Sequence, residues 1–292
     1  MFYHDKRLQY TVRVEKPNAN FARLLQQAVG GVEGEIRVMM QYLFQAWNSR
    51  GPAKYRDMLL NTGTEEIGHI EMLATAIALN LEKAPNDLKD DIANSNALVG
   101  AVMGGQDPRH VLSAGLGCMA ADANGVPFNG SWVVSTGNIA SDMYANVHAE
   151  ASGRVLATRL YEMTDDAGMK DMLSFLIARD TMHQNQWLAA LEELGGVQGA
   201  VPIPNSFPAE KQAEAFAYTY VNTYIGEQDQ AQGRWTNGPS IDGKGSFSQE
   251  KIRGLGDEPR LGPPHPLAHA QAEQMTGSGG KDLLEKVSGM LS

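Results

Sequence analysis

The chain has 292 residues, of which 42% are hydrophobic, enough for a substantial core in one large domain or in a domain with long extensions. A formal net charge of −10 and the lack of any Lys/Arg block argue against a nucleic-acid partner. The N-terminus shows no secretory signal, and the longest apolar stretch, Met72–Leu81, is too short to span a bilayer. A single cysteine, Cys118, excludes an intrachain disulfide and fits a reducing compartment. Together with the lack of a signal or an apolar span, this leads us to expect a cytoplasmic protein without a membrane partner.

Four long helical patterns dominate the N-terminal part of the chain. Apolar residues recur every three or four positions in them, which is typical of helices that bury one face. Gly51-Pro52 ends the first helix and opens the second, and Gly195-Gly196 ends the fourth. The sequence predicts helices over about Asn20–Arg50, Ala53–Asn80 and Ser135–Met163, and from the turn at Thr164–Gly168 to Leu194.

The links between these helices are short, long and short. Short links make neighbouring helices antiparallel. The long middle link, Leu81–Val133 with a short helical piece at Asp87–Met103, is a crossover that lets the third helix run parallel to the second. This connectivity is that of the ferritin-like four-helix bundle. We therefore predict an all-α fold in which residues 1–195 form a ferritin-like bundle domain with an N-terminal extension.

Residues 196–292 have a different character. Proline, glycine and serine are frequent, and no apolar periodicity marks a core. Such a segment cannot fold alone, so it is either disordered or an arm that packs on neighbouring subunits. Trp235, Phe247 and Leu261 favour the second interpretation, an extended Pro/Gly-rich C-terminal arm.

Acidic residues and histidines recur on the four predicted helices. Two helices carry an acid three residues before a histidine, which puts both side chains on one face about one turn apart. Two such pairs, with a Glu from each of two further helices, are the ligand set of two-metal sites in helix bundles. The positions are Glu35, the pair Glu66 and His69, Glu150, and the pair Asp180 and His183.

These positions are predicted to converge inside the bundle. Each lies about 16 residues from the turn beside its helix, roughly 24 Å along the axis at 1.5 Å per residue. They face the core, where an unpaired charge is costly, and a metal pair is the simplest compensation. The alternative is that Glu66, Glu150 and both histidines are buried in plain hydrogen bonds. A further acid–histidine match, Asp107–His110, contains a proline and is interpreted as a helix start.

Several segments resemble one known family, the non-haem manganese catalases, and the likeness runs from the first residues to about residue 250. The segments that carry the resemblance are Gly34–Tyr42, Glu65–Met72, Glu162–Asp165, the Pro-Ile-Pro that ends at Pro204, and Trp235–Gly243. The resemblance implies two manganese ions per chain. One would be ligated by Glu35 and His69 and the other by Glu150 and His183, with Glu66 bridging them.

The resemblance also implies the substrate, hydrogen peroxide, which a catalase disproportionates to water and dioxygen. Asp180 would be an acid beside the metals that relays protons, and Tyr42 a phenol bonded to Glu35. Oxygen and imidazole ligands suit manganese and iron alike, so ligand identity alone does not choose the metal.

Members of this family often carry calcium at a subunit contact, and the resemblance further implies a homohexamer. The positions that match the calcium ligands in part are Asp57, Asn61, Asn222, Tyr224 and Gly226. Asn61 replaces an acid and Tyr224 replaces a small hydroxyl residue, so occupancy by one calcium ion is left open.

Two other functions remain open at the level of sequence. A ferritin-like iron-handling protein, either a ferroxidase or a storage shell, would use similar ligands, although storage shells usually lack such a long Pro/Gly-rich tail. Relatives in this family also occur in spore coats as structural proteins. The presence of all five ligand positions argues against a purely structural role.

Overall fold

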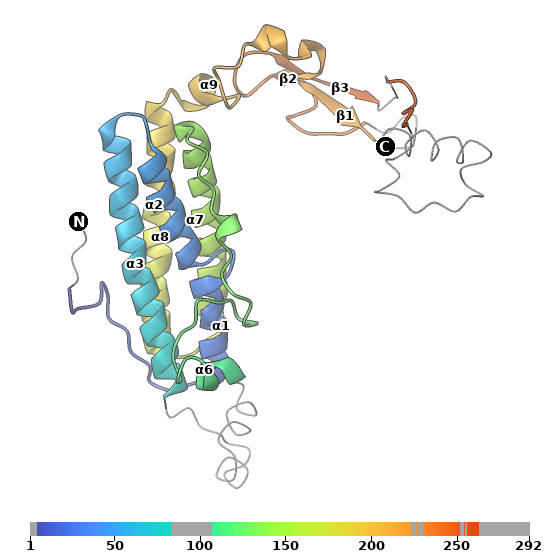
Figure 1. The fold of residues 1–292 in the computed structure, drawn as a ribbon. Coiled ribbons are helices and arrows are strands. Elements are labelled where there is room, and N and C mark those ends of the chain that lie inside the picture. Colours follow the sequence, from blue (N-terminus) through green and yellow to red (C-terminus); the bar gives the residue numbers. More distant parts are fainter. Residues whose placement is uncertain are drawn as a thin grey trace, which may run out of the picture.

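The computed structural model describes residues 5–82, 107–223, 226, 230–251, 254 and 256–262. The predicted short helix over Asp87–Met103 lies outside these ranges. Four long helices stand side by side as a bundle, with the C-terminal arm leaving one end (Figure 1). They are α2 (Glu35–Asn48), α3 (Ala53–Leu81), α7 (Ile139–Glu162) and α8 (Ala167–Glu193).

The connectivity of the bundle agrees with the prediction. Short links join α2 to α3 and α7 to α8, and each of these pairs packs along its length. The described part of the crossover contains α6 (Pro108–Leu112), with Asp107 as its N-cap, and the short 3-10 helix η1 (Gly130–Trp132). Asp107 accepts a hydrogen bond from the backbone N–H of Arg109, so this acid–histidine match is a helix start, as expected. None of the described helices is long and apolar enough to cross a membrane.

The first predicted helix is in fact two helices. The helix α1 (Ala19–Gly30) ends at an extended residue, Gly31, and α2 begins only at Glu35. At Gly34 a β-carbon would lie 2.7 Å from the carbonyl oxygen of Val29, so the chain can turn this tightly only with glycine there. The break makes Glu35 the first residue of a helix, where the helix dipole favours a carboxylate.

Buried amides fasten the crossover to the bundle. Gln41 and Gln45 on α2 both donate hydrogen bonds to Asn146 on α7, at 2.8 and 2.9 Å. Gln45 also donates to the carbonyl oxygen of Val134, and the Val134 N–H donates to Gln41. Because these amides satisfy one another, they fix the crossover against α2 and α7 without leaving a buried polar group unpaired.

An N-terminal strap, residues 5–18, crosses the seam between α3 and α8. Gln9 donates a 2.8 Å hydrogen bond to the carbonyl oxygen of Glu65 on α3. Arg13 pairs with Asp171 on α8 at 2.9 Å, and Asp166 accepts backbone N–H bonds from two strap residues, each 2.8 Å long. The strap therefore ties the two helices together from outside.

Two apolar clusters fill the bundle, and on α3, α7 and α8 the predicted metal ligands lie between the members of the two clusters in the sequence. On α3, Leu59 belongs to one cluster and Leu73 to the other, with Glu66 and His69 between. The clusters are centred on different ends of the bundle. The larger fully buried members are Leu25, Met72, Leu73, Ile77, Leu81, Met169, Met172 and Leu173 in one, and Tyr42, Leu59, Met143 and Trp187 in the other.

The C-terminal arm has more regular structure than predicted. It contains the short helix α9 (Gly196–Ala200), two 3-10 helices, and a small sheet with strand order β1-β3-β2. The strand β3 pairs in parallel with β1 and antiparallel with β2. The 3-10 helices are η2 (Ala209–Lys211) and η3 (Glu214–Phe216), and the strands are β1 (Thr219–Asn222), β2 (Gly238–Pro239) and β3 (Ser246–Lys251).

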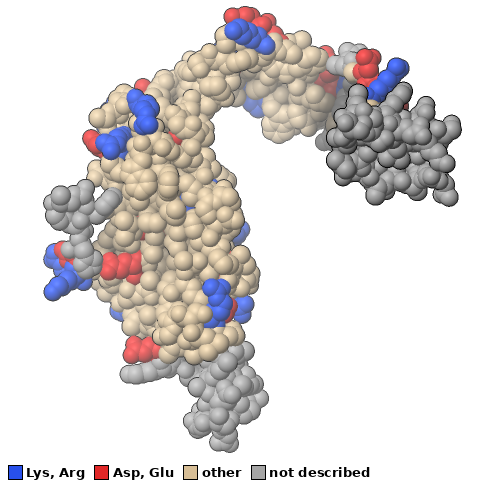
Figure 2. All heavy atoms as spheres, in the orientation of Figure 1, with Lys and Arg blue, Asp and Glu red and all other residues tan. Residues whose placement is uncertain are grey.

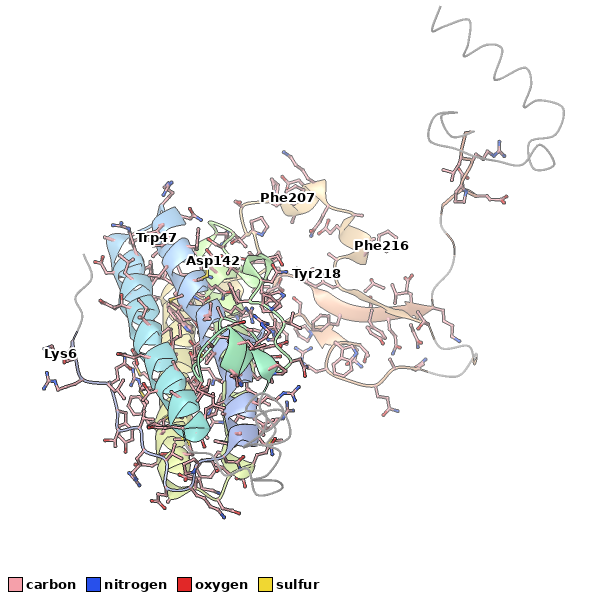
Figure 3. The ribbon with its side chains drawn as sticks, turned by 60° about the horizontal axis from the view of Figure 1, so that its bottom comes forward. Lys6, Trp47, Asp142, Phe207, Phe216 and Tyr218 are labelled. Atoms are coloured by element: carbon pink, nitrogen blue, oxygen red, sulfur yellow. The ribbon has the colours of Figure 1, made fainter. Side chains whose placement is uncertain are left out.

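The arm leaves the bundle and exposes large apolar side chains. Figures 1 and 2 show it extending sideways from one end of the bundle, and Figure 3 shows Phe207 and Phe216 along it. Both of these rings are 54% exposed, and Trp235 is 53% exposed. The bundle face seen in Figure 2 also carries few charged side chains.

Candidate metal centre

Each predicted ligand comes from a different part of the bundle. Glu35 opens α2, Glu150 lies in the middle of α7, and each acid–histidine pair occupies one turn of α3 or α8. All are buried except Glu35, whose side chain is 15% exposed. The fold thus gathers four carboxylates and two imidazoles inside the bundle. They are Glu35, Glu66, His69, Glu150, Asp180 and His183.

The structure groups five of these residues into two three-donor sites. One site consists of Glu35, Glu66 and His69, and the other of Glu66, Glu150 and His183, with the donor atoms of each within 4.8 Å of one another. Glu66 belongs to both. The Nδ1 atom of His69 lies 2.5 Å from one Glu66 oxygen, and Nδ1 of His183 lies 3.0 Å from the other. A single carboxylate therefore stands between the two sites.

The histidine and carboxylate side chains of the two sites are arranged as ligands of divalent cations and not as hydrogen-bond partners of one another. Both Nδ1 atoms are buried close to carboxylate oxygens, yet they have no hydrogen-bond partner, and neither has Oε1 of Glu66. Buried polar atoms are nearly always hydrogen-bonded. Nitrogen and oxygen atoms that lie this close without a hydrogen bond therefore indicate that a cation normally binds between them. Carboxylate oxygens with imidazole nitrogens are the donor set of manganese, iron and similar ions.

Comparison with known proteins identifies the family to which this set of donors belongs. Residues 1–278 match the family described as manganese-containing catalase. A manganese catalase of Bacillus subtilis is 45% identical over 269 residues, which cover 92% of this chain and 97% of that protein. This chain belongs to the manganese catalase family. The predicted enzyme class, a non-haem manganese-dependent catalase, is thereby confirmed.

Two further proteins are similar to this chain. The B. subtilis strain 168 protein YjqC is 49% identical over 247 residues, which cover 85% of this chain and 88% of YjqC. The crystal structure of KatB, a manganese catalase from Anabaena, matches with a TM-score of 0.66 at 25% identity and covers 86% of this chain and 99% of KatB. The ferritin-like bundle predicted for this family member is confirmed by that likeness.

Crowded charges shift the pKa values of the acids in this manganese catalase. Burial and the neighbouring charge of Glu66 raise the pKa of Glu35 to about 7. Burial and the charges of Glu35, Glu150 and Glu66 raise the pKa of Asp180 to about 9. Burial also acts to raise the pKa of Glu66, but the two imidazoles outweigh it and the value falls to about 2. Glu66 is therefore ionised in the cation-free protein, whereas Glu35 and Asp180 hold protons more tightly than ordinary carboxyls.

The histidines respond to the same charges. Burial acts to lower the pKa of His183, but the carboxylates of Glu150, Glu65 and Glu66 raise it to about 12. Burial likewise opposes the charge of Glu66 at His69, whose pKa rises well above its ordinary value. Without a cation the cluster is thus stabilised by bound protons, and cations entering it would displace those protons.

Tyr42 lies at the site, but its partner differs from the prediction. Its buried hydroxyl donates a hydrogen bond to Glu150 on α7, not to Glu35 on its own helix. The ring packs against Trp187 with centroids 4.9 Å apart, which directs the hydroxyl across the bundle. Burial, followed by the charge of Glu150, raises the pKa of Tyr42 well above 10, so the phenol remains a donor.

Asp180 is buried beside the cluster without joining either three-donor site. It is 7% exposed and lies one turn before His183 on α8. Burial and the nearby charges of Glu35, Glu150 and Glu66 raise the pKa of Asp180. The prediction that it acts as a proton relay, and not as a ligand, stays a prediction.

Glu65 is a site residue that the sequence analysis missed. One of its oxygens lies 3.3 Å from Nε2 of His183 and the other 3.6 Å from Nε2 of His69, and Arg179 binds the same carboxylate at 2.6 Å. The signal was present, because Glu65 lies four residues before His69 and so shares its helix face. The three-residue spacing of acid and histidine points to Glu66 and leaves Glu65 out.

The structure does not bring the halves of the predicted calcium site together within one chain. Asp57 and Asn61 are exposed on α3, whereas Asn222 is buried in β1 of the arm, where its amide donates to Gln249 at 3.4 Å. Gly226 is exposed, and Tyr224 lies outside the described residues. Calcium binding at these positions stays a prediction.

The raised pKa values predict how stability of the cation-free protein depends on pH. Glu35, Asp180 and His183 have ordinary values of 4.5, 3.8 and 6.5, and folding raises them to about 7, 9 and 12. Between about pH 5 and pH 9 the folded chain therefore holds more protons than the unfolded chain, and its free energy of unfolding falls as pH rises. Glu65 and Glu66, whose pKa values are lowered, oppose this only below about pH 4.5.

We expect the Tm of chelator-treated protein, followed by circular dichroism, to fall between about pH 6 and pH 9. Manganese should restore the Tm at the higher pH, because cations replace the lost protons. Asp180→Asn removes one titrating group and should flatten the dependence. A Tm that rises over this range would contradict the proposed origin of the shifts.

Proposed function

We propose that this protein disproportionates hydrogen peroxide to water and dioxygen at a carboxylate-bridged di-manganese centre. The observation that carries the proposal is the position of Glu66, which is shared by two otherwise separate three-donor sites. Glu35 and His69 would complete one manganese site, and Glu150 and His183 the other. Family membership supports manganese over iron, which the donor set alone would accept equally well.

The metal pair would supply the electron transfer of the reaction. Two manganese ions that each change by one electron exchange two electrons together, so one hydrogen peroxide is oxidised to dioxygen and a second is reduced to two waters. Four carboxylates and a phenol would surround the metal pair. Five protein ligands for two ions would leave coordination positions open for the peroxide. The work left to the protein is to hold the ligands and to move protons.

Asp180 is suited to carry protons in this reaction. Its carboxyl is buried and is not one of the grouped donors, and in the cation-free protein burial and nearby carboxylates raise its pKa to about 9. Oxidation of peroxide releases two protons, and reduction of a second peroxide consumes two. Bound cations would favour its ionised form, and a buried carboxylate beside the metals can then take up and give back these protons one at a time.

Tyr42 is suited to orient one ligand. Its hydroxyl donates to Glu150 from a buried ring that is packed against Trp187, so the carboxylate is held while its other oxygen remains available. Such support keeps a ligand in place without adding charge to the centre.

The purified protein should contain two manganese ions per chain and should evolve oxygen from hydrogen peroxide without haem. Elemental analysis gives the metal, an oxygen electrode gives the activity, and the absence of a haem absorption band excludes the common alternative. Two irons with no oxygen evolution would point to an iron-handling protein. Absence of any bound metal would point to a structural role.

Glu66→Ala and Asp180→Asn should separate a bridging ligand from a proton relay. Glu66→Ala removes the donor that both sites share, so both metals should be lost. Asp180→Asn should keep both metals and reduce turnover by about 10²- to 10⁴-fold, the usual contribution of a general acid or base. Equal loss of metal in the two variants would make Asp180 a ligand.

We also propose that residues 196–292 pack on neighbouring subunits of a homohexamer. Support comes from the large apolar side chains that the arm exposes, among them Phe207, Phe216 and Trp235, since exposed apolar surface of this kind marks interaction sites. The bundle offers matching surface, with Phe44 42% and Trp47 49% exposed on α2.

Truncation after Ile203 should weaken the oligomer and open the metal centre to solvent. Light scattering measures the assembly, and retention of manganese during dialysis measures the opening. A matched full-length variant, Trp235→Ser, should show a smaller change in the same direction. An intact oligomer with full activity after truncation would show that the arm is dispensable.

A further inference from the structure

Glu65 faces the outer nitrogens of both metal-binding histidines. Its two oxygens lie 3.3 Å from Nε2 of His183 and 3.6 Å from Nε2 of His69. Both Nε2 atoms are buried and have no hydrogen-bond partner, although Glu65 is the carboxylate beside each of them. The two rings are stacked at 26° with centroids 5.9 Å apart, so one carboxylate can serve both.

The opposite nitrogens of the same rings face the proposed metals. Nδ1 of His69 is close to Glu66 and Glu35, and Nδ1 of His183 is close to Glu66 and Glu150. A neutral imidazole that binds a metal through Nδ1 must carry its proton on Nε2. That N–H then needs an acceptor, because an unpaired buried donor is costly. Glu65 is the carboxylate beside both nitrogens, and a small approach to His69 from the present 3.6 Å would let it accept from both rings.

Arg179 holds the Glu65 carboxylate at the edge of the bundle. Its Nε and Nη2 donate to the two oxygens of Glu65 at 2.6 and 3.3 Å, a two-point contact that fixes both the position and the plane of the carboxylate. The side chain of Glu65 is 26% exposed and that of Arg179 33%. The pair therefore joins α3 to α8 at the boundary between the buried histidines and solvent.

We propose that Glu65 is a positioning residue shared by both metal-binding histidines, held in place by Arg179, and that it determines how tightly both manganese ions are bound. The proposal rests on the paired metal site proposed above. Glu65 acts by accepting one N–H from each ring, which fixes the tautomer that leaves Nδ1 free as a ligand. Because a single carboxylate serves both rings, its loss weakens both metal sites together.

A simpler role would be that of an ordinary ion pair. Partly exposed ion pairs contribute little to stability, and an Arg179–Glu65 pair of that kind would leave metal binding unchanged. The two roles therefore differ in manganese affinity, which can be measured separately from catalysis.

The test compares Glu65→Gln with Glu71→Gln in the full-length protein. Gln has the size of Glu but presents one acceptor oxygen and one amide NH₂, so it cannot accept from both rings. Glu71 is an exposed residue of the same helix, and its replacement makes the same change in net charge. Manganese binding is measured by equilibrium dialysis, and coupling of the two ions by low-temperature electron paramagnetic resonance.

We expect Glu65→Gln to weaken the binding of both ions by about 10- to 100-fold, the usual effect of losing such a partner of a ligand, and to alter the resonance of the coupled pair. Glu71→Gln should match the unsubstituted protein. Arg179→Gln should weaken binding less than Glu65→Gln, and Arg179→Lys should recover part of that loss. Chelator-treated variants should keep the circular dichroism of the unsubstituted protein.

Three results would overturn the proposal. Affinity of Glu65→Gln within twofold of Glu71→Gln would leave Glu65 as an ordinary ion pair. Loss of one ion alone would show that it serves only one histidine. Should Glu65→Gln not fold, Glu65→Asp takes its place, and unchanged affinity there would overturn the proposal equally. If the unsubstituted protein binds no manganese, the proposed catalase function fails first, and the comparison of variants has no bearing on it.

Discussion

Repulsion among the buried carboxylates of Glu35, Glu66, Glu150 and Asp180 is the constraint on which the rest of the structure depends. Apolar side chains at both ends of the bundle remove water from around these groups, so the charges cannot be screened by solvent. Only positive charge between them can make the arrangement stable. Imidazoles, retained protons or divalent cations can each supply it, and the two groups of three donor side chains could hold the last of these. The apolar clusters thus strengthen the repulsion among the carboxylates, and the charged centre requires compensating positive charge.

Helix periodicity explains why the convergence of these side chains could be predicted from the sequence. A spacing of three residues fixes the relative direction of Glu66 and His69 on any helix, whatever surrounds it. The predicted distance of Glu35 from the turn at Gly51-Pro52 is unaffected by the break in its helix, because only the residues of α2 separate it from that turn. The partner of Tyr42 could not be predicted in this way. Its hydroxyl lies at the tip of a long side chain, and the packing of Trp187 decides which carboxylate it meets.

The features that the sequence did not reveal depend on contacts between distant segments. The break before Glu35 needs close backbone packing at Gly34, which a helical pattern of apolar residues conceals. The strands Thr219–Asn222 and Ser246–Lys251 are short and largely exposed, so the alternation along them is too weak to predict a strand. Their pairing joins segments far apart in the chain. Two of the contacts that mark Glu65 as a site residue, those with His183 and Arg179, form only when α8 packs beside α3.

The N-terminal strap has a consequence for the order in which a new chain can fold. A ribosome releases the strap first, yet its partners Asp166 and Asp171 lie on the last helix of the bundle to be made. Glu35 similarly emerges long before His183. Gln9 can reach its partner once α3 is made, but Arg13 and the backbone of Glu15 and Lys16 must wait for the segment that begins α8. The strap can close over the seam only when α8 arrives, so the last long helix of the bundle completes both the candidate metal centre and the contacts that cover it from outside.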